Sequence, residues 1–143
     1  MAKLMQSLQF KAAVISRVDK AERTAAFVAS TGARDHYGDI VEPAGWDLRD
    51  YLANPVLLRS HDQNRVIGRV EEIGIKNDRL DASQVRFRPA GESADADDVW
   101  SMLQGGFIKG ASVGFLPIER ESILDADGYH TGWLFKRQKL LEL

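Results

Sequence analysis

Residues 108–118, Ile-Lys-Gly-Ala-Ser-Val-Gly-Phe-Leu-Pro-Ile, restrict the fold more than any other part of the chain. They contain the G-x-S-x-G pattern, in which a serine can sit on a sharp turn between a strand and a helix. The residues after Ser112 cannot begin a good helix, and an α/β-hydrolase core is longer than this whole chain. We therefore predict a strand over 108–118 and exclude the α/β-hydrolase fold. Taken alone, Gly110 and Gly114 favour a bulged or closely packed strand in which Ser112 is merely small.

The stretches around this segment predict further strands and two helices. Apolar and β-branched residues indicate strands over 9–18, 22–30, 55–61, 66–75, 79–88 and 133–143. Pro43 opens a helical pattern that Asn54-Pro55 ends. A second helix begins at the acidic run 95–98, which suits the positive end of a helix dipole, and ends at Gly105-Gly106. Because strands and helices do not alternate regularly, we predict a mainly antiparallel α+β fold, a barrel or sandwich of about seven strands with two packed helices.

Composition excludes several classes of protein. The 143 residues carry a net charge of −2 and no cysteine, which excludes disulfides, thiolate zinc sites and a cysteine nucleophile. The length predicts a single domain over residues 1–143. There is no basic surplus for nucleic-acid binding, no apolar run long enough to span a bilayer, and no apolar stretch typical of a signal peptide. We expect a soluble protein without nucleic-acid or membrane partners.

Two histidines are candidates for chemistry. His61 follows a predicted strand, and histidine is the side chain whose ordinary pKa suits a base for serine near neutral pH. The pattern alone favours a surface histidine at a strand end over a catalytic base. His36 lies between Asp35 and Asp39, but this spacing matches no established metal site, so a turn-capping loop is the better interpretation. We predict no metal and no cofactor.

Four stretches together point to a family. They are Tyr37-Gly-Asp-Ile-Val-Glu-Pro-Ala-Gly-Trp46, Asn54-Pro-Val-Leu-Leu-Arg-Ser-His-Asp62, Met102-Leu-Gln-Gly-Gly-Phe-Ile-Lys-Gly-Ala-Ser-Val-Gly-Phe115 and Leu140-Leu-Glu-Leu143. In order and spacing they resemble the tailed-phage prohead protease family across most of the chain. The resemblance implies a fold like the herpesvirus capsid-assembly protease, a small β-barrel of about seven strands wrapped by helices.

The family resemblance also implies an activity and a set of site residues. The implied enzyme is a serine endopeptidase with Ser112 as nucleophile, His61 as general base and Glu142 as the third member. The amide nitrogens of Val113 and Gly114 are the candidate oxyanion donors. The implied substrates are phage scaffold and major capsid proteins, cleaved inside the assembling procapsid in the bacterial host cytoplasm. A homo-oligomer is left open.

The sequence departs from the family pattern at its end. It stops one residue after Glu142, before the family's closing segment, so we expect a domain truncated at its C-terminus. Terminal residues fray unless they pair in a sheet, so we expect a mobile strand end and an incomplete triad. Two alternatives remain: a catalytically inactive relative that acts as an assembly or scaffold-binding module, and a β-barrel that binds a small ligand.

Overall fold

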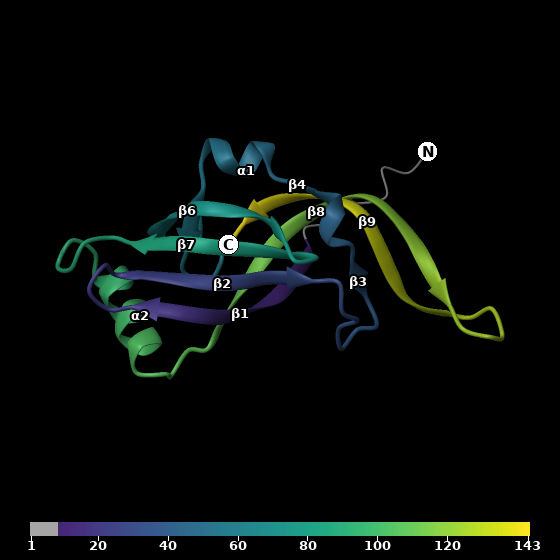
Figure 1. Cartoon of the computed structure of the whole chain (residues 1–143), viewed down its shortest axis with the longest axis horizontal. Helices are drawn as coiled ribbons and strands as arrows, with labels where there is room; N and C mark the ends of the chain where they lie inside the picture. The colour runs from purple at the N-terminus through teal and green to yellow at the C-terminus, as the bar shows by residue number, and fades with distance from the viewer. Residues whose placement is uncertain (1–8) are drawn as a thin grey trace.

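The structure is a computed structural model that describes the backbone of residues 9–143 and the side chains of Gln9 and residues 14–143. Its elements, in chain order, are β1 (Gln9–Asp19), β2 (Thr24–Thr31), β3 (Ile40–Val41), η1 (Pro43–Gly45), β4 (Trp46–Asp47), α1 (Arg49–Ala53), β5 (Val56–Leu58), β6 (Val66–Lys76), β7 (Arg79–Phe87), α2 (Ala94–Gln104), β8 (Gly110–Leu124) and β9 (His130–Glu142) (Figure 1). Within the described residues, neither α-helix has the length and apolarity needed to cross a membrane.

The nine strands of the described residues form one mixed sheet. Its order is β3-β9-β8-β1-β2-β7-β6-β5, and β4 also pairs with β9. Most neighbours are antiparallel, whereas the two short strands β3 and β4 run parallel to β9. The β8–β9 hairpin projects well beyond the rest of the molecule (Figure 1).

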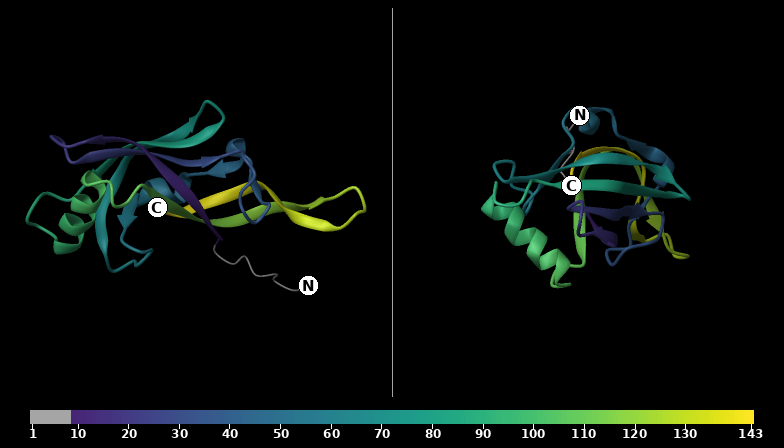
Figure 2. Two further views of the ribbon diagram at one scale, coloured as in Figure 1. Left: turned by 90° about the horizontal axis from the view of Figure 1, so that it is seen from below. Right: turned by 60° about the vertical axis from the view of Figure 1, so that its left-hand side comes forward.

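The sheet curls but does not close. Figure 2 shows it wrapping around an interior with α2 on its flank. Among the described residues no strand ladder joins β5 to β9, although the backbone N–H of Leu58 donates to the carbonyl of Leu143 at 2.9 Å across this gap. The predicted antiparallel barrel of about seven strands is therefore corrected to an open, mixed sheet of nine. The two extra strands have two residues each, too few for an alternating pattern to reveal them.

The helix predicted to begin at Pro43 is broken into three pieces. Residues Pro43–Gly45 form a 3₁₀ turn, Trp46–Asp47 form β4, and only Arg49–Ala53 are α-helical. A Cβ on Gly45 would overlap the carbonyl oxygen of Lys136, so this approach to β9 requires glycine. Pairing with β9 therefore overrides the helical periodicity of this stretch.

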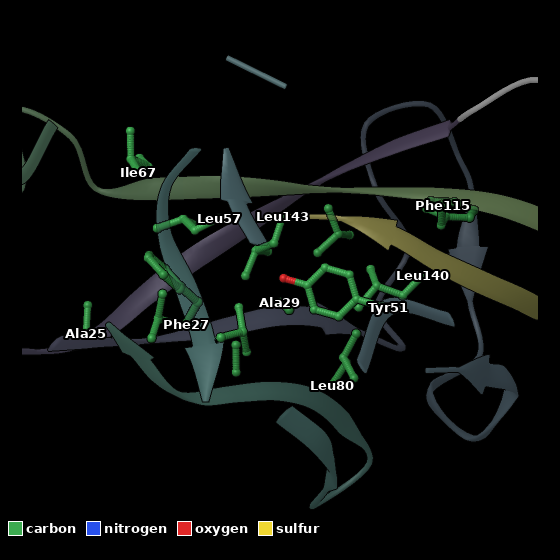
Figure 3. Close-up of a cluster of buried hydrophobic side chains, with 14 of the residues drawn as sticks. Ala25, Phe27, Ala29, Tyr51, Leu57, Ile67, Leu80, Phe115, Leu140 and Leu143 are labelled. Atoms are coloured by element: carbon green, nitrogen blue, oxygen red, sulfur yellow. The ribbon is translucent and has the colours of Figure 1, made fainter. Parts of the chain in front are cut away.

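The hydrophobic core lies inside the curl of the sheet. Figure 3 shows side chains from many elements converging there, including Tyr51 of α1, Leu57 of β5 and Leu140 of β9. The ring of Phe115 meets those of Trp46 and Phe135 edge to face, with centroids 5.4 Å apart in each pair. Because β8 supplies Phe115, the core fixes the strand that also carries Ser112.

Helix α2 packs on the flank of the sheet through its apolar face. The Ser93 hydroxyl caps its first turn by accepting a hydrogen bond from the backbone N–H of Ala96 at 3.2 Å. Ala96, Trp100 and Leu103 are buried, and the Trp100 ring lies 5.0 Å from that of Phe87 in β7. This packing places α2 beside the gap between β5 and the start of β8, where the candidate site lies.

Candidate active site

Three side chains that are distant in sequence, Glu142, His61 and Ser112, contact one another in this order along a single line. The Oγ atom of Ser112 lies 2.5 Å from Nε2 of His61, and Nδ1 of the same ring lies 2.8 Å from Oε1 of Glu142. The His61 side chain is 28% exposed and that of Glu142 is 8% exposed, so the line runs from a buried carboxylate toward solvent. The roles of base and nucleophile require His61 and Ser112 to face each other, and they do. They do not lie on neighbouring strands, because β5 and β8 are far apart in the strand order.

His61 lies in a tight turn and not on a strand. The strand predicted over 55–61 ends at Leu58. Ser60 and His61 then take left-handed backbone conformations, with φ of 53° and 56°. Each such residue costs on the order of 1–3 kcal/mol and persists only where the surroundings enforce it. The turn is closed by two backbone hydrogen bonds of 3.0 Å, from Arg59 N–H to the Arg65 carbonyl and from Asp62 N–H to the Arg59 carbonyl.

A cluster of charges fastens this turn to α2. Arg59 donates from Nη1 to Oδ1 of Asp95 at 2.9 Å, and Arg65 donates to both carboxylate oxygens of the same residue. Arg59 also reaches Asp98 at 2.7 Å. The hydrogen bond from Arg65, assisted by Arg59, holds the pKa of the Asp95 carboxyl below its usual range, so the carboxylate is ionised near neutral pH. From sequence, the acidic run indicated only the start of a helix, and its contacts to the His61 turn were missed.

Glu142 reaches His61 because its neighbour in β8 is a glycine. Gly114 is directly opposite Glu142 in the β8–β9 ladder, and a Cβ on Gly114 would lie 2.5 Å from Cγ of Glu142. The Glu142 side chain therefore crosses β8 through the space that a side chain at position 114 would otherwise occupy. The predicted closely packed strand is confirmed at this position. The expected frayed end is not found, since β9 pairs through Glu142 and the Leu143 carbonyl accepts a hydrogen bond.

The two amides expected to serve as oxyanion donors lie in β8. Val113 is opposite Lys11 of β1, while Gly114 has neighbours on both sides, Phe10 and Glu142. Successive residues of a regular strand direct their N–H groups to opposite edges, so only one of these two amides can face the edge away from β1. That Val113 or Gly114 donates a hydrogen bond to the oxyanion stays a prediction, and only one of the two amides can do so from this edge.

Two known phage proteins are similar to this chain in sequence. No family model matches the chain. It is 29% identical over 112 residues to the capsid polyprotein of Pseudomonas phage PAJU2, which covers 76% of this chain and 16% of that protein. It is 28% identical over 99 residues to the prohead protease of Escherichia phage T5, covering 65% of this chain and 44% of that protein. The chain is related to the phage prohead proteases.

A solved structure shares the fold of this chain. The structure of the bacteriophage T4 capsid assembly protease matches with a TM-score of 0.68 and 12% sequence identity, over 95% of this chain and 93% of that one. The resemblance predicted from the four sequence stretches is confirmed by the two sequence matches, and the fold agrees with it. The chain spans less than half the length of either curated relative.

The remaining candidate residues of this prohead protease relative lie elsewhere. His36 is exposed, and Asp35 beside it caps a turn by accepting 2.9 Å hydrogen bonds from the amides of Tyr37 and Asp39. Residues 9–143 include no group of three or more acidic or histidine side chains suited to a metal ion.

A second serine–histidine pair lies on the projecting β8–β9 hairpin. Nδ1 of His130 is 3.1 Å from Oγ of Ser122, and both residues are exposed. In the part of the chain that the structure describes, no carboxylate lies within ion-pair distance of His130. This pair therefore lacks the third member that His61 has, and it offers a matched control for experiments on Ser112.

Proposed function

We propose that this chain is the catalytic domain of a serine endopeptidase that cleaves scaffold and major capsid proteins during maturation of a phage procapsid. The observation that carries the proposal is the line from Glu142 through His61 to Ser112, with contacts of 2.8 and 2.5 Å. The names of the relatives, a prohead protease and a capsid polyprotein, support the substrate class. Such an enzyme acts inside the assembling procapsid in the bacterial host cytoplasm.

The proposed chemistry begins with proton transfer from Ser112 to His61. A serine hydroxyl is a weak nucleophile until a base removes its proton, and Nε2 of His61 is within hydrogen-bond reach of Oγ. The oxygen attacks the carbonyl carbon of the scissile peptide bond and forms a tetrahedral intermediate. His61 then returns the proton to the leaving amine, and the acyl group remains on Ser112. Water, deprotonated by the same ring, hydrolyses this ester and regenerates the serine.

Glu142 serves as the residue that orients the base. A carboxylate at Nδ1 favours the tautomer with the proton on Nδ1, which leaves Nε2 free to accept the serine proton. It also stabilises the imidazolium that forms during the reaction. Because Glu142 is 8% exposed, water screens this interaction far less than it would at the surface. One backbone amide of Val113 or Gly114 supplies a hydrogen bond to the developing oxyanion.

A cleavage experiment tests the proposal against the alternative of an inactive assembly module. The chain is incubated with purified scaffold and major capsid proteins of the phage that encodes it, and the products are mapped by mass spectrometry. We expect defined cuts that vanish in Ser112→Ala and persist in the control Ser122→Ala. Binding of scaffold without any cleavage by the unaltered chain would instead favour the inactive module.

A further inference from the structure

An apolar cavity adjoins the catalytic line. It has a volume of about 400 Å³, and Ser112 and His61 form part of its wall. The rest of the wall comes from the sheet and from α2 and consists mainly of apolar side chains, among them Phe27, Leu57, Ile67, Phe87, Val99 and Met102. A cavity of this size is within the range of binding pockets that receive a ligand group.

The charged side chains around the cavity already have partners within the protein. Apart from His61, the charged side chain in its wall is Arg59, which is bonded to Asp95 and Asp98. Among the described residues, no acidic side chain lines it. A basic or acidic group entering this space would lose water without gaining an uncommitted partner of opposite charge, whereas an apolar group would gain from burial.

The strand that carries Ser112 lies along the cavity, because Gly110, Ala111 and Ser112 form part of its wall. Among the described residues, Gly110–Val113 pair only with β1, because the ladder to β9 begins at Gly114. Leu143, which follows β9, and Leu57 of β5 also line the cavity. Because Ser112 and His61 are part of the same wall, a peptide whose scissile bond reaches Ser112 can direct a neighbouring side chain into the cavity.

We propose that this cavity is a specificity pocket that takes a medium or large apolar side chain of the substrate, within two residues of the scissile bond. The proposal rests on the proposed function, because it needs Ser112 to be the nucleophile. Met102 is the residue that sets the depth of the pocket. It lies on α2, is only partly buried, and has a flexible side chain that adapts to its neighbours.

The test is to read the cleavage preference from a complex peptide mixture. The chain digests a library of peptides made from a denatured proteome, and the new termini are sequenced by mass spectrometry. We expect Leu, Met or Phe to be enriched at one fixed position within two residues of the cut. Met102→Trp, which fills the pocket, should lower cleavage of these peptides by roughly 10–200-fold relative to peptides with Ala at that position. Met102→Ala should shift the preference toward larger side chains.

Two controls separate failure of this proposal from failure of the proposed function. Leu52→Trp, on the exposed face of α1, should leave the preference unchanged. Labelling of Ser112 by a small fluorophosphonate should persist in Met102→Trp, which shows that the site is intact. Cleavage with a charged or absent preference at that position, or a preference that both Met102 variants retain, would overturn the pocket while leaving the protease in place. A chain that neither cleaves nor labels would overturn the protease itself.

Discussion

Replacing Gly114 with alanine should disable the site without touching any of its three side chains. The new Cβ would lie 2.5 Å from Cγ and 2.9 Å from Oε1 of Glu142. Carbon atoms in ordinary contact are about 3.5–4.0 Å apart, so the Glu142 side chain must retreat by about 1 Å. Its backbone is held opposite Gly114 in the ladder, and therefore the carboxylate has to move. A displacement near 1 Å can cost about a hundredfold in rate, which is the loss of kcat that we expect.

The assay compares kcat for a scaffold-derived peptide, together with thermal melting, in Gly114→Ala and the control Gly74→Ala. Gly74 lies in β6 with no atom near its Cβ position, so its alanine variant should keep full activity. Since Gly114→Ala acts through Glu142, it should add little to the loss already caused by Glu142→Gln. A Gly114→Ala chain that melts normally and cleaves within twofold of the unaltered chain would refute the reasoning. So would losses that simply multiply in the double variant.

Four further predictions concern the residues that support the site and the core. Asp95→Asn should lower kcat by roughly tenfold or more with KM little changed, because it loosens the turn that carries His61. Asp98→Asn loses only one hydrogen bond to Arg59 and should lower kcat less. A pH–rate profile and a KM measurement check both variants. The hydrogen bond from Arg65 lowers the pKa of Asp95 from its ordinary value of 3.8. The contacts of Asp95 with Arg59 and Arg65 are therefore intact above that value and are lost only as the pH falls through the lowered pKa. A fall in activity between pH 5 and 7 that Asp95→Asn abolishes would contradict this role of Asp95. Tyr51→Phe removes the 2.9 Å hydrogen bond from the buried hydroxyl to the Val56 carbonyl and should cost about 0.5–1.5 kcal/mol in denaturant unfolding, whereas no measurable change would show that the bond contributes nothing. Phe115→Ala opens a cavity between Trp46 and Phe135 and should cost about 3–5 kcal/mol by the same method, so a loss below 1 kcal/mol would argue against this core.

The sequence predicted the long elements of the fold well. The hairpins β1–β2 and β6–β7 and helix α2 lie close to the predicted ranges, because each has a strong apolar pattern bounded by polar turns. It did not predict β3 and β4, because each pairs through two residues with partners in β9 that lie 94 and 92 positions further along the chain, respectively. A local pattern contains no information about such a distant partner, which is also why the helix beginning at Pro43 was predicted as one piece.

The candidate site was predicted in its residues but not in its geometry. Family resemblance brought His61, Ser112 and Glu142 together, and no spacing within the sequence would have done so. The left-handed turn at Ser60 and His61 was missed because a positive φ is uncommon in any residue other than glycine, even in histidine, which adopts it more often than most. The links from Asp95 to Arg59 and Arg65 were missed because an acidic run before a helix has a sufficient local explanation in the helix dipole. The crossing of Glu142 over Gly114 becomes visible only when the strand register is known.

The central claim is that Ser112 is a nucleophile activated by His61 and Glu142, and the position of a covalent adduct tests it most directly. The chain is treated with a fluorophosphonate, digested, and mapped by mass spectrometry, with the labelling rate followed in parallel. We expect one phosphonylated residue, Ser112, with labelling abolished in His61→Ala and slowed in Glu142→Gln. An adduct on Ser122 in place of Ser112, or labelling of Ser112 at the same rate without His61, would contradict the account.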